Sequence, residues 1–351
     1  MSFQITVQPS GRSFSAEADE FVLAAAIRQG IGMPYGCRDG ACGSCKCKKL
    51  EGQVEHGPHQ SKALNEMEEA NGMMLACCAK PLSDLILESR QVTLSGAFAI
   101  KKMPARVLSL AKKAPDVMLV RIQLPASDTL QYHAGQFLEI ILRDGDRRSY
   151  SMANAPHTLG PLPPGTPSPG VEFHIRYMAG GKFTEHVFAS MKDKEILRVE
   201  GPYGSFYLRE ESSKPIIFLA SGTGFAPIKA VIEHMAHKGI AREATLYWGG
   251  RRPMDLYLED WVKQRLTEMP HLRYVPVISD ALPEDAWSGR TGFVHRAVLQ
   301  DFPDLSKHQV YVCGAPIVVD SARADFIKLA GLPEEDFFAD SFVTAADKAK
   351  S

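Results

Sequence analysis

Four cysteines in the first quarter of the sequence have the spacing of an iron–sulfur ligand set. Cys37, Cys42 and Cys45 are arranged as C-x4-C-x2-C, and a further thiol follows at Cys77. In the plant-type [2Fe-2S] arrangement, one loop supplies three thiolates and a more distant residue supplies the fourth. The spacing therefore predicts a [2Fe-2S] cluster held by Cys37, Cys42, Cys45 and Cys77.

The loop around these thiols is rich in glycine. Gly36, Gly40 and Gly43 alternate with the predicted ligands. Glycine tolerates positive φ and lets backbone N–H groups approach sulfur, and such hydrogen bonds help to set the reduction potential of a cluster. The composition of the loop therefore supports the cluster.

Zinc and disulfide chemistry are the alternatives for these thiols. Zinc sites usually combine two short Cys/His pairs, and only Cys42 and Cys45 have that spacing here. Two further thiols lie beside the ligand set. Cys47 is expected to point away from the cluster on an extended strand, and Cys78 competes with Cys77 for the fourth position.

The elements that must position the cluster loop are expected to form a small ferredoxin-sized α+β domain at residues 1–95. Residues 3–8 alternate apolar and polar side chains as a strand with one exposed face does, and residues 13–15 predict a second strand. Asp19 is placed to cap a helix over residues 20–29, immediately before the loop. Later elements are a strand at 47–53, a short helix at 64–70 and a strand at 84–91.

Length and composition exclude several classes of protein. A chain of 351 residues has room for two or three domains, and a hydrophobic content of 45% is ordinary for globular proteins. The net charge of −1 gives no support to nucleic-acid binding. No apolar run approaches the roughly 18–20 residues of a membrane span, and residues 1–4 do not begin a signal sequence. A cytoplasmic protein without a membrane segment is expected, which also suits its free cysteines.

A β-rich domain is expected at residues 104–209, after a linker over residues 95–104. Strand-like runs at 105–109, 117–123 and 137–142 are separated by Pro, Gly and Asp turn signals. An antiparallel β-barrel is the simplest way to arrange short strands without exposed edges.

Two segments of this β-rich domain carry side chains suited to a flavin nucleotide. Arg148, Tyr150 and Ser151 offer a guanidinium for phosphate, a ring for stacking and a hydroxyl for the flavin edge. Residues 174–184 offer small residues and a hydroxyl at an expected helix N-terminus, where a pyrophosphate is favoured. The Pro- and Gly-rich loop between the segments, residues 157–170, is expected to be an insertion.

Residues 210–351 alternate strands and helices, which predicts an α/β doubly wound parallel sheet with its ligand at the carboxyl ends of the strands. Strands are expected at 215–220, 244–248, 272–279 and 309–312, with an amphipathic helix ending near residue 238. Gly222 and Gly224 would let a pyrophosphate approach the helix start, although Pro227 stands where the third glycine of the usual fingerprint would be. Residues 313–316 close another strand at the same edge.

Together these motifs resemble the ferredoxin–NADP reductase superfamily. They are Arg148-x-Tyr150-Ser151, Gly222-Thr223-Gly224-x-x-Pro227 and Cys313-Gly314-x-Pro316. With the cysteine pattern in front, the chain from about residue 3 to 342 resembles the reductase components of bacterial multicomponent oxygenases and the CDP-6-deoxy-glucoseen reductases. Leu75-Ala76-Cys77 resembles the tripeptide that carries the last ligand of plant-type ferredoxins, which favours Cys77 over Cys78.

The resemblance implies a site for FAD and a site for a nicotinamide nucleotide. The FAD-binding residues that it implies are Arg148, Tyr150, Ser151, Arg176, Gly181 and Thr184. The nicotinamide-binding residues are Gly222, Thr223, Gly224, Pro227, Arg251, Cys313, Gly314 and Pro316. It places Ser151 near the flavin N5, Cys313 near the hydride path and Phe342 beside the flavin ring. The segment 247–251 resembles NADH-preferring branches, while Arg251 and Arg252 leave NADPH open.

The predicted function is an NAD(P)H-dependent iron–sulfur flavoprotein reductase. It would pass electrons from NADH through FAD to the [2Fe-2S] cluster and on to a partner protein, an oxygenase or sugar dehydrase component. The alternative is a flavin or ferric reductase with small-molecule acceptors, and a purely structural iron–sulfur protein comes third. The cluster favours the first of these, since a small-molecule flavin reductase needs no such domain.

Overall fold

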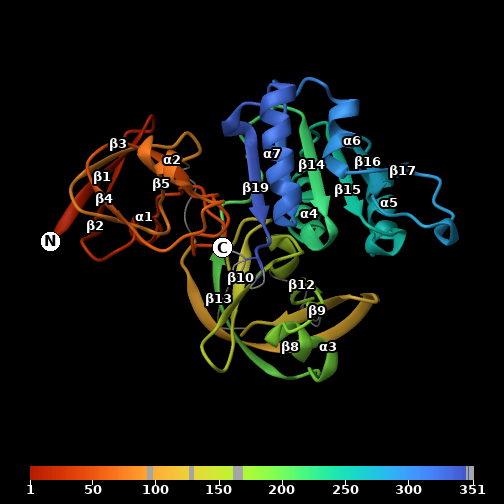
Figure 1. Ribbon diagram of the computed structural model, residues 1–351. Helices are drawn as coiled ribbons and strands as arrows, with labels where there is room; N and C mark the ends of the chain where they lie inside the picture. The colour runs from red at the N-terminus through yellow and green to blue at the C-terminus, as the bar shows by residue number, and fades with distance from the viewer. Residues whose placement is uncertain (93–97, 126–129, 161–168, 345–346, 348–351) are drawn as a thin grey trace. The chain divides into compact units, whose positions relative to one another are not determined.

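The computed structural model describes residues 1–92, 98–125, 130–160, 169–344 and 347 (Figure 1). It separates into two compact units, one formed by Met1–Ala99 with Ser341–Ser351 and the other by Ile100–Asp340. Part of the predicted linker, residues 95–97, and part of the Pro- and Gly-rich loop, residues 161–168, lie outside the described residues.

The first unit is built on a five-stranded sheet with the strand order β2-β1-β7-β3-β5. Its strands are β1 (Ser2–Gln8), β2 (Arg12–Glu17), β3 (Lys46–Glu51), β5 (Met73–Leu75) and β7 (Leu85–Glu88), and β4 (Val54–His56) pairs with β6 (Ala79–Pro81). Two helices accompany them, α1 (Val22–Arg28) and α2 (Glu66–Ala70). α1 buries apolar residues such as Val22 and Ala26, spaced to lie on one helix face. The chain between α1 and β3 is the cysteine-rich loop.

The start of α1 differs from the prediction. The helix begins at Val22 rather than at residue 20, and Phe21 occupies the N-cap position without a side-chain hydrogen bond. Asp19 is therefore not the cap. Glu20 lies in the preceding turn and pairs with Arg28 at 2.8 Å, so this stretch is held by an ion pair instead of a capping carboxylate.

The second unit begins with a six-stranded antiparallel sheet of order β11-β10-β13-β8-β9-β12. Its strands are β8 (Lys101–Ala114), β9 (Val117–Gln123), β10 (Phe137–Ile141), β11 (Arg147–Ser151), β12 (Val171–Arg176) and β13 (Ile196–Tyr203). Val107, Leu138 and Phe173 from three of these strands lie in one buried core. The rings of Tyr150 on β11 and Phe173 on β12 are 6.3 Å apart, so the two outer strands of the order approach each other.

β8 begins inside the predicted linker. Residues 101–104 already belong to the strand, and Pro104 lies opposite Arg198 of β13. The prediction of a linker up to residue 104 is therefore wrong at its C-terminal end. Proline donates no backbone hydrogen bond, which hid the strand in the sequence.

The rest of the second unit is a parallel sheet of order β17-β16-β15-β14-β18-β19. Its strands are β14 (Ile216–Ser221), β15 (Ala244–Gly250), β16 (Leu272–Ile278), β17 (Arg290–Thr291), β18 (Gln309–Gly314) and β19 (Phe337–Ser341). The chain runs outward from β14 through β15, and later returns to β18 on the other side of β14. The strand order thus reverses beside β14, where doubly wound sheets bind their ligands.

Helices cover both faces of the parallel sheet (Figure 1). They are α4 (Phe225–Lys238), α5 (Glu259–Glu268), α6 (Val294–Asp301) and α7 (Pro316–Ala330). Val298 of α6 and Phe326 of α7 share a core with Leu219 and Val312 of the strands. On α4, Phe225 stacks on Trp248 of β15 at 3.9 Å. No helix in the described part of the chain is long and apolar enough to cross a membrane.

A partly buried histidine in the second unit, His133, is expected to make stability depend on pH. Burial, aided by the charge of Arg209, lowers the pKa of His133 to about 4, and its ring stacks on Tyr207 at 4.4 Å. Because the folded pKa lies below the unfolded value of about 6.5, His133 contributes stability that is fully present above pH 6.5 and is lost as the pH falls towards 4.

We expect the loss to reach at most about 1.4 kcal/mol per pH unit for this single proton. Urea unfolding at pH 7 and pH 5, followed by tryptophan fluorescence, reports on the second unit because Trp248, Trp261 and Trp287 all lie there. A His133→Gln variant should lose less stability between these two pH values than the unmodified protein does. An equal loss in both proteins would show that His133 does not cause the dependence.

Candidate functional site

The four thiols predicted to hold the cluster form two pairs. Cys37, Cys42 and Cys45 lie between α1 and β3, and Cys77 lies between β5 and β6. The side chains of Cys37 and Cys42 hydrogen-bond each other, and so do those of Cys45 and Cys77. Two irons bridged by sulfide require two pairs of thiolates. The pairing of the thiols therefore suits a dinuclear cluster.

Hydrogen bonds favour one thiolate in each pair. The backbone N–H groups of Cys37 and Ser44 lie 3.4 and 3.5 Å from the sulfur of Cys42. The hydrogen bond from the Cys37 thiol, supported by Ser44, lowers the pKa of Cys42, and hydrogen bonds from Cys45 and Cys78 lower the pKa of Cys77. The thiolate is the form that binds iron.

Gly40 lets the loop close over these sulfurs. Its φ is +77°, and a Cβ would lie 2.8 Å from the sulfur of Cys78 and 2.8 Å from Cβ of His59. The sulfurs of Cys77 and Cys78 are 3.5 Å apart, so the choice of Cys77 as the fourth ligand stays a prediction. Cys47 is buried on β3, and burial raises its pKa to about 12.

The predicted flavin residues of β11 lie at one edge of the antiparallel sheet. The ring of Tyr150 packs against those of Phe173 at 6.3 Å and Phe183 at 5.5 Å, and burial raises the pKa of its hydroxyl. The hydroxyl of Ser151 is buried and has no hydrogen-bond partner among the described residues. Leaving a buried hydroxyl unpaired is costly, so a polar flavin edge beside Ser151 would satisfy it. These side chains fit a flavin.

Ion pairs hold the start of α3 (Lys182–Ala189) next to β11. Asp146 accepts hydrogen bonds from Arg148 at 3.2 Å and from Lys182 at 2.9 Å. Gly181 is the N-cap of α3, and a Cβ on it would lie 2.5 Å from Oγ1 of Thr184. The hydroxyl of Thr184 bonds to the backbone of the preceding turn at 2.9 Å, which shapes the turn itself. Five of the six predicted FAD residues thus lie in these two neighbouring segments.

The two glycine loops of the parallel sheet meet at the carboxyl ends of β14 and β18. The turn Gly222–Gly224 links β14 to α4, whose first turn contains Pro227. A Cβ on Gly224 would lie 2.0 Å from the carbonyl oxygen of Cys313. A Cβ on Gly314, which has φ +136°, would lie 2.6 Å from the last carbonyl of β14. Without side chains at these positions, the loops form a backbone cradle at the point where the strand order reverses, which fits a dinucleotide.

Arg176 joins the predicted flavin and nicotinamide sites. Its guanidinium lies over Gly222, where a Cβ would be 2.7 Å from Nη1. It donates to Asp255 at 3.2 Å and pairs with Asp116 at 3.1 Å. Asp255 also accepts the backbone N–H of Arg251 at 2.7 Å. Asp255 was not among the predicted residues, because its only local signal is its place in a proline-initiated turn.

The two arginines after β15 differ in their surroundings. The side chain of Arg251 is 70% exposed, and its Nε is 3.9 Å from Asp255. Arg252 donates to both carboxylate oxygens of Asp285, at 2.6 and 2.7 Å. Arg252 is thus engaged by Asp285, while Arg251 offers an exposed guanidinium beside the dinucleotide cradle.

The remaining predicted residues lie at strand and helix ends. Cys313 is fully buried near the end of β18, and burial raises the pKa of its thiol. Pro316 is the first residue of α7, a position that suits proline. Phe338 stacks on Tyr311 at 4.7 Å within the parallel sheet. Phe342 follows β19 and is partly buried, and its predicted place beside the flavin stays a prediction.

Three family models match successive parts of the chain. The 2Fe-2S iron-sulfur cluster binding domain matches residues 5–82, the oxidoreductase FAD-binding domain matches 104–207, and the oxidoreductase NAD-binding domain matches 218–324. Each match includes the residues described above for the corresponding group, except Phe342, which lies outside all three.

Curated relatives match over nearly the whole chain. The CDP-6-deoxy-L-threo-D-glycero-4-hexulose-3-dehydrase reductase of Yersinia pseudotuberculosis is 38% identical over 343 residues, which cover 98% of this chain and 99% of the relative. Terephthalate 1,2-dioxygenase reductase component 2 of a Comamonas species is 36% identical, and 98% of each chain is covered. The crystal structure of the Amycolatopsis cytochrome P450 reductase GcoB is similar with a TM-score of 0.76 at 30% identity, covering 98% of this chain and 99% of that one.

Proposed function

This chain belongs to the family of three-domain, NAD(P)H-dependent iron–sulfur flavoprotein reductases, and from that premise we propose how its own residues carry the electrons. It is an oxidoreductase that passes electrons from NAD(P)H through FAD to a [2Fe-2S] cluster and on to a partner protein. A flavin accepts two electrons as a hydride and can release them singly to a cluster. The predicted family, function and cofactors are confirmed.

We propose that each group is bound within one of three domains, at residues 1–95, 104–209 and 210–351. Cys37, Cys42, Cys45 and Cys77 hold the cluster, Arg148 to Ser151 with Arg176, Gly181 and Thr184 hold FAD, and the Gly222–Pro227 and Cys313–Pro316 loops with Arg251 hold the nicotinamide nucleotide. The antiparallel strands β8–β13 close into the flavin-binding barrel of this proposal. Its support is the pairing of the thiols, the unpaired hydroxyl of Ser151 and the backbone cradle at Gly224.

We propose that the acceptor is an oxygenase component or a sugar dehydrase component. Both kinds of partner are named in the titles of relatives that align along almost the whole chain. The pairing of the four thiols is the observation that supports a protein acceptor. A small-molecule acceptor could take electrons directly from the flavin and would need no cluster. This favours the electron-transfer component over a flavin or ferric reductase.

An anaerobic titration with NADH tests this function. The purified protein, containing FAD and iron, is titrated while visible absorption is recorded, and low-temperature EPR is measured at the end point. Bleaching of both flavin and cluster bands with a reduced [2Fe-2S] signal is the expected result. Bleaching of the flavin with an oxidised cluster, under both NADH and NADPH, would contradict transfer to the cluster.

Ser151→Ala should slow flavin reduction by NADH about 10-fold, the equivalent of one hydrogen bond of about 1.4 kcal/mol at the flavin edge. Stopped-flow absorption at saturating NADH measures the rate constant. Ser149→Ala is the matched control, because Ser149 lies on the same strand and is exposed. Equal rate constants in the two variants would remove Ser151 from the proposed flavin site.

A further inference from the structure

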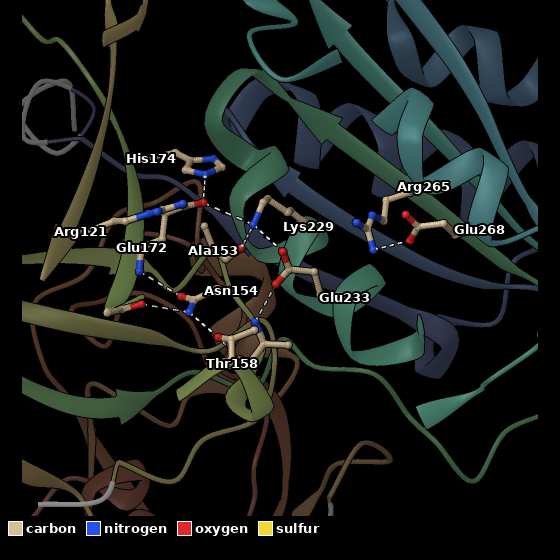
Figure 2. A network of polar contacts seen from close by, with 12 residues as sticks. Arg121, Ala153, Asn154, Thr158, Glu172, His174, Lys229, Glu233, Arg265 and Glu268 are labelled. Atoms are coloured by element: carbon tan, nitrogen blue, oxygen red, sulfur yellow. Dashed lines mark hydrogen bonds and ion pairs between the residues drawn. The ribbon is translucent and has the colours of Figure 1, made fainter. Parts of the chain in front are cut away.

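A largely buried ionic network connects the antiparallel sheet of the second unit to helix α4 (Figure 2). At its centre is Lys229 of α4, which is 6% exposed. Its ammonium donates to the carbonyl of Ala153 at 2.9 Å and to Glu233 at 2.7 Å, and it lies 3.3 Å from Glu172. The carboxylate of Glu233 also accepts the backbone N–H of Ala155 at 3.0 Å. We call Lys229, Glu233 and Glu172, with the backbone of Ala153 and Ala155, the Lys229 latch.

Glu172 of β12 is the part of the Lys229 latch that belongs to the antiparallel sheet. Its carboxylate accepts hydrogen bonds from Arg121 at 2.9 Å and contacts His174 at 3.1 Å, and its carbonyl accepts the N–H of Ala153 at 2.8 Å. The other ring nitrogen of His174 is 2.8 Å from the hydroxyl of Tyr257. Two cations, the buried Lys229 and the half-exposed Arg121, thus balance two carboxylates, so the buried charges are paired.

Buried ion pairs are weak evidence for stability, because desolvation offsets their attraction. Because a buried ion pair requires one geometry, it can instead fix the relative position of the elements that carry its two charges. Here the fixed arrangement is that of α4 relative to the chain that leaves β11. Lys229 and Glu233 are one helical turn apart, so both hold the same face of α4 against residues 153–155.

The two anchors of the latch lie close to the two nucleotide sites. Ala153 follows Ser151 by two residues, a distance of about 7 Å in extended chain. Lys229 follows Gly224 by five residues of helix, a rise of about 7.5 Å. Any shift at the latch therefore moves the dinucleotide cradle relative to the flavin strand.

We propose that Lys229 and Glu233 are positioning residues for hydride transfer, because they hold the Gly222–Gly224 turn in register with Ser151. This inference rests on the proposed flavin and nicotinamide sites. In the step concerned, the hydride leaves the nicotinamide as it is oxidised, and the flavin is reduced by the same two electrons. Loss of the latch leaves both binding sites intact but misplaces them, and a displacement of about 1 Å can slow such a transfer about 100-fold.

The test uses Lys229→Met and Glu233→Gln in the FAD- and iron-loaded protein. We expect the rate constant of flavin reduction at saturating NADH to fall roughly 10- to 100-fold, with FAD content and the Kd for NADH close to those of the unmodified protein. The melting temperature of Lys229→Met should fall, because Glu172 and Glu233 lose their shared cation, but the protein should stay folded at the assay temperature. The isotope effect with NADH deuterated at the transferred position should rise, because hydride transfer becomes more fully rate-limiting. Cytochrome c reduction by dithionite-reduced protein should be unchanged, since it does not use the nicotinamide site.

Lys263→Met is the matched control. Lys263 pairs with Glu259 one turn away at 2.7 Å, as Lys229 pairs with Glu233, but its side chain is 60% exposed on α5. The flavin of the Lys263→Met variant should be reduced by NADH at the rate of the unmodified protein. If Lys229→Met fails to fold, Glu233→Gln supplies the same comparison, and Lys229→Arg should restore part of the rate because arginine can still donate to Ala153.

Two results would overturn the latch as a positioning device. One is an unchanged rate constant and isotope effect in both Lys229→Met and Glu233→Gln. The other is a slower reduction fully accounted for by lost FAD or by unfolding at the assay temperature. An unmodified protein whose flavin is not reduced by NADH or NADPH would instead contradict the proposed function itself.

Discussion

Cys77→Ser should lower the rate of NADH-dependent cytochrome c reduction to the background rate of a cluster-free reductase. The rate of ferricyanide reduction, which takes electrons directly from the flavin, should be retained. Cys77 hydrogen-bonds Cys45, and replacing its thiol by a hydroxyl removes one of the four proposed iron ligands. Because the cluster passes electrons one at a time to the protein acceptor, its loss should stop that transfer without affecting the nucleotide sites. Steady-state assays with the two acceptors, together with iron content and EPR, measure the effect.

Cys78→Ser is the decisive comparison for this result. The sulfurs of Cys77 and Cys78 are only 3.5 Å apart, so the two thiols compete for the same ligand position. Cys78→Ser should retain the EPR signal if Cys77 is the ligand, and Cys47→Ala should retain it as well, because Cys47 lies outside the thiol pairs on β3. Loss of the signal in Cys78→Ser with retention in Cys77→Ser would reverse the assignment.

Gly224→Ala should slow flavin reduction by NADH about 100-fold or more, because the ends of β14 and β18 must separate. A methyl group at this position would lie 2.0 Å from the carbonyl oxygen of Cys313, and a backbone atom cannot move aside as a flexible side chain can. The backbone of Gly224 is helical, with φ −58°, so the effect is one of space rather than of backbone conformation. Stopped-flow reduction by NADH, compared with reduction by dithionite, separates damage to the nucleotide site from damage to the flavin.

Gly239→Ala provides the control for that substitution. Gly239 ends α4 with φ +65°, and a methyl group added to it would have no atom within 4 Å. Alanine there costs stability, about 1–2 kcal/mol, without blocking a site. The rate of flavin reduction by NADH should stay normal in this variant. A normal rate in Gly224→Ala would mean that the two loops can separate without consequence for the nicotinamide.

The structure gives these residues a common arrangement in which each electron-carrying group has its own supporting elements. The thiol pairs depend on a loop closed by Gly40, the proposed flavin site on the end of β11, and the proposed dinucleotide cradle on two strand ends. Arg176 and Asp255 connect the last two proposed sites, and the Lys229 latch is our proposed device for positioning the same pair from the side of α4. We therefore expect substitutions between the nucleotide sites to affect hydride transfer more than cofactor binding.

The sequence alone determined the chemistry of this protein. The C-x4-C-x2-C spacing is a local pattern that predicts the cluster, because three of the ligands lie close together along the chain. The glycines at residues 222–224 and the Arg148-x-Tyr150-Ser151 segment predict the two nucleotide sites through their resemblance to the ferredoxin–NADP reductase superfamily. The alternation of strands and helices after residue 210 likewise predicted the parallel sheet. Local signals failed where an element lacked its usual marker, as at Pro104 within β8 and at Phe21, which takes the cap position predicted for Asp19.

Only the tertiary structure decided how the patterns meet. The pairing of Cys45 with Cys77, the contact of Gly224 with Cys313, and the position of Asp255 all join residues that are far apart in the sequence. Lys229, Glu233 and Glu172 have ordinary sequence surroundings, and on a helix such charges usually face solvent. Their proposed role follows from the contact of α4 with the antiparallel sheet and from the burial of Lys229 and Glu172, which neither periodicity nor spacing encodes.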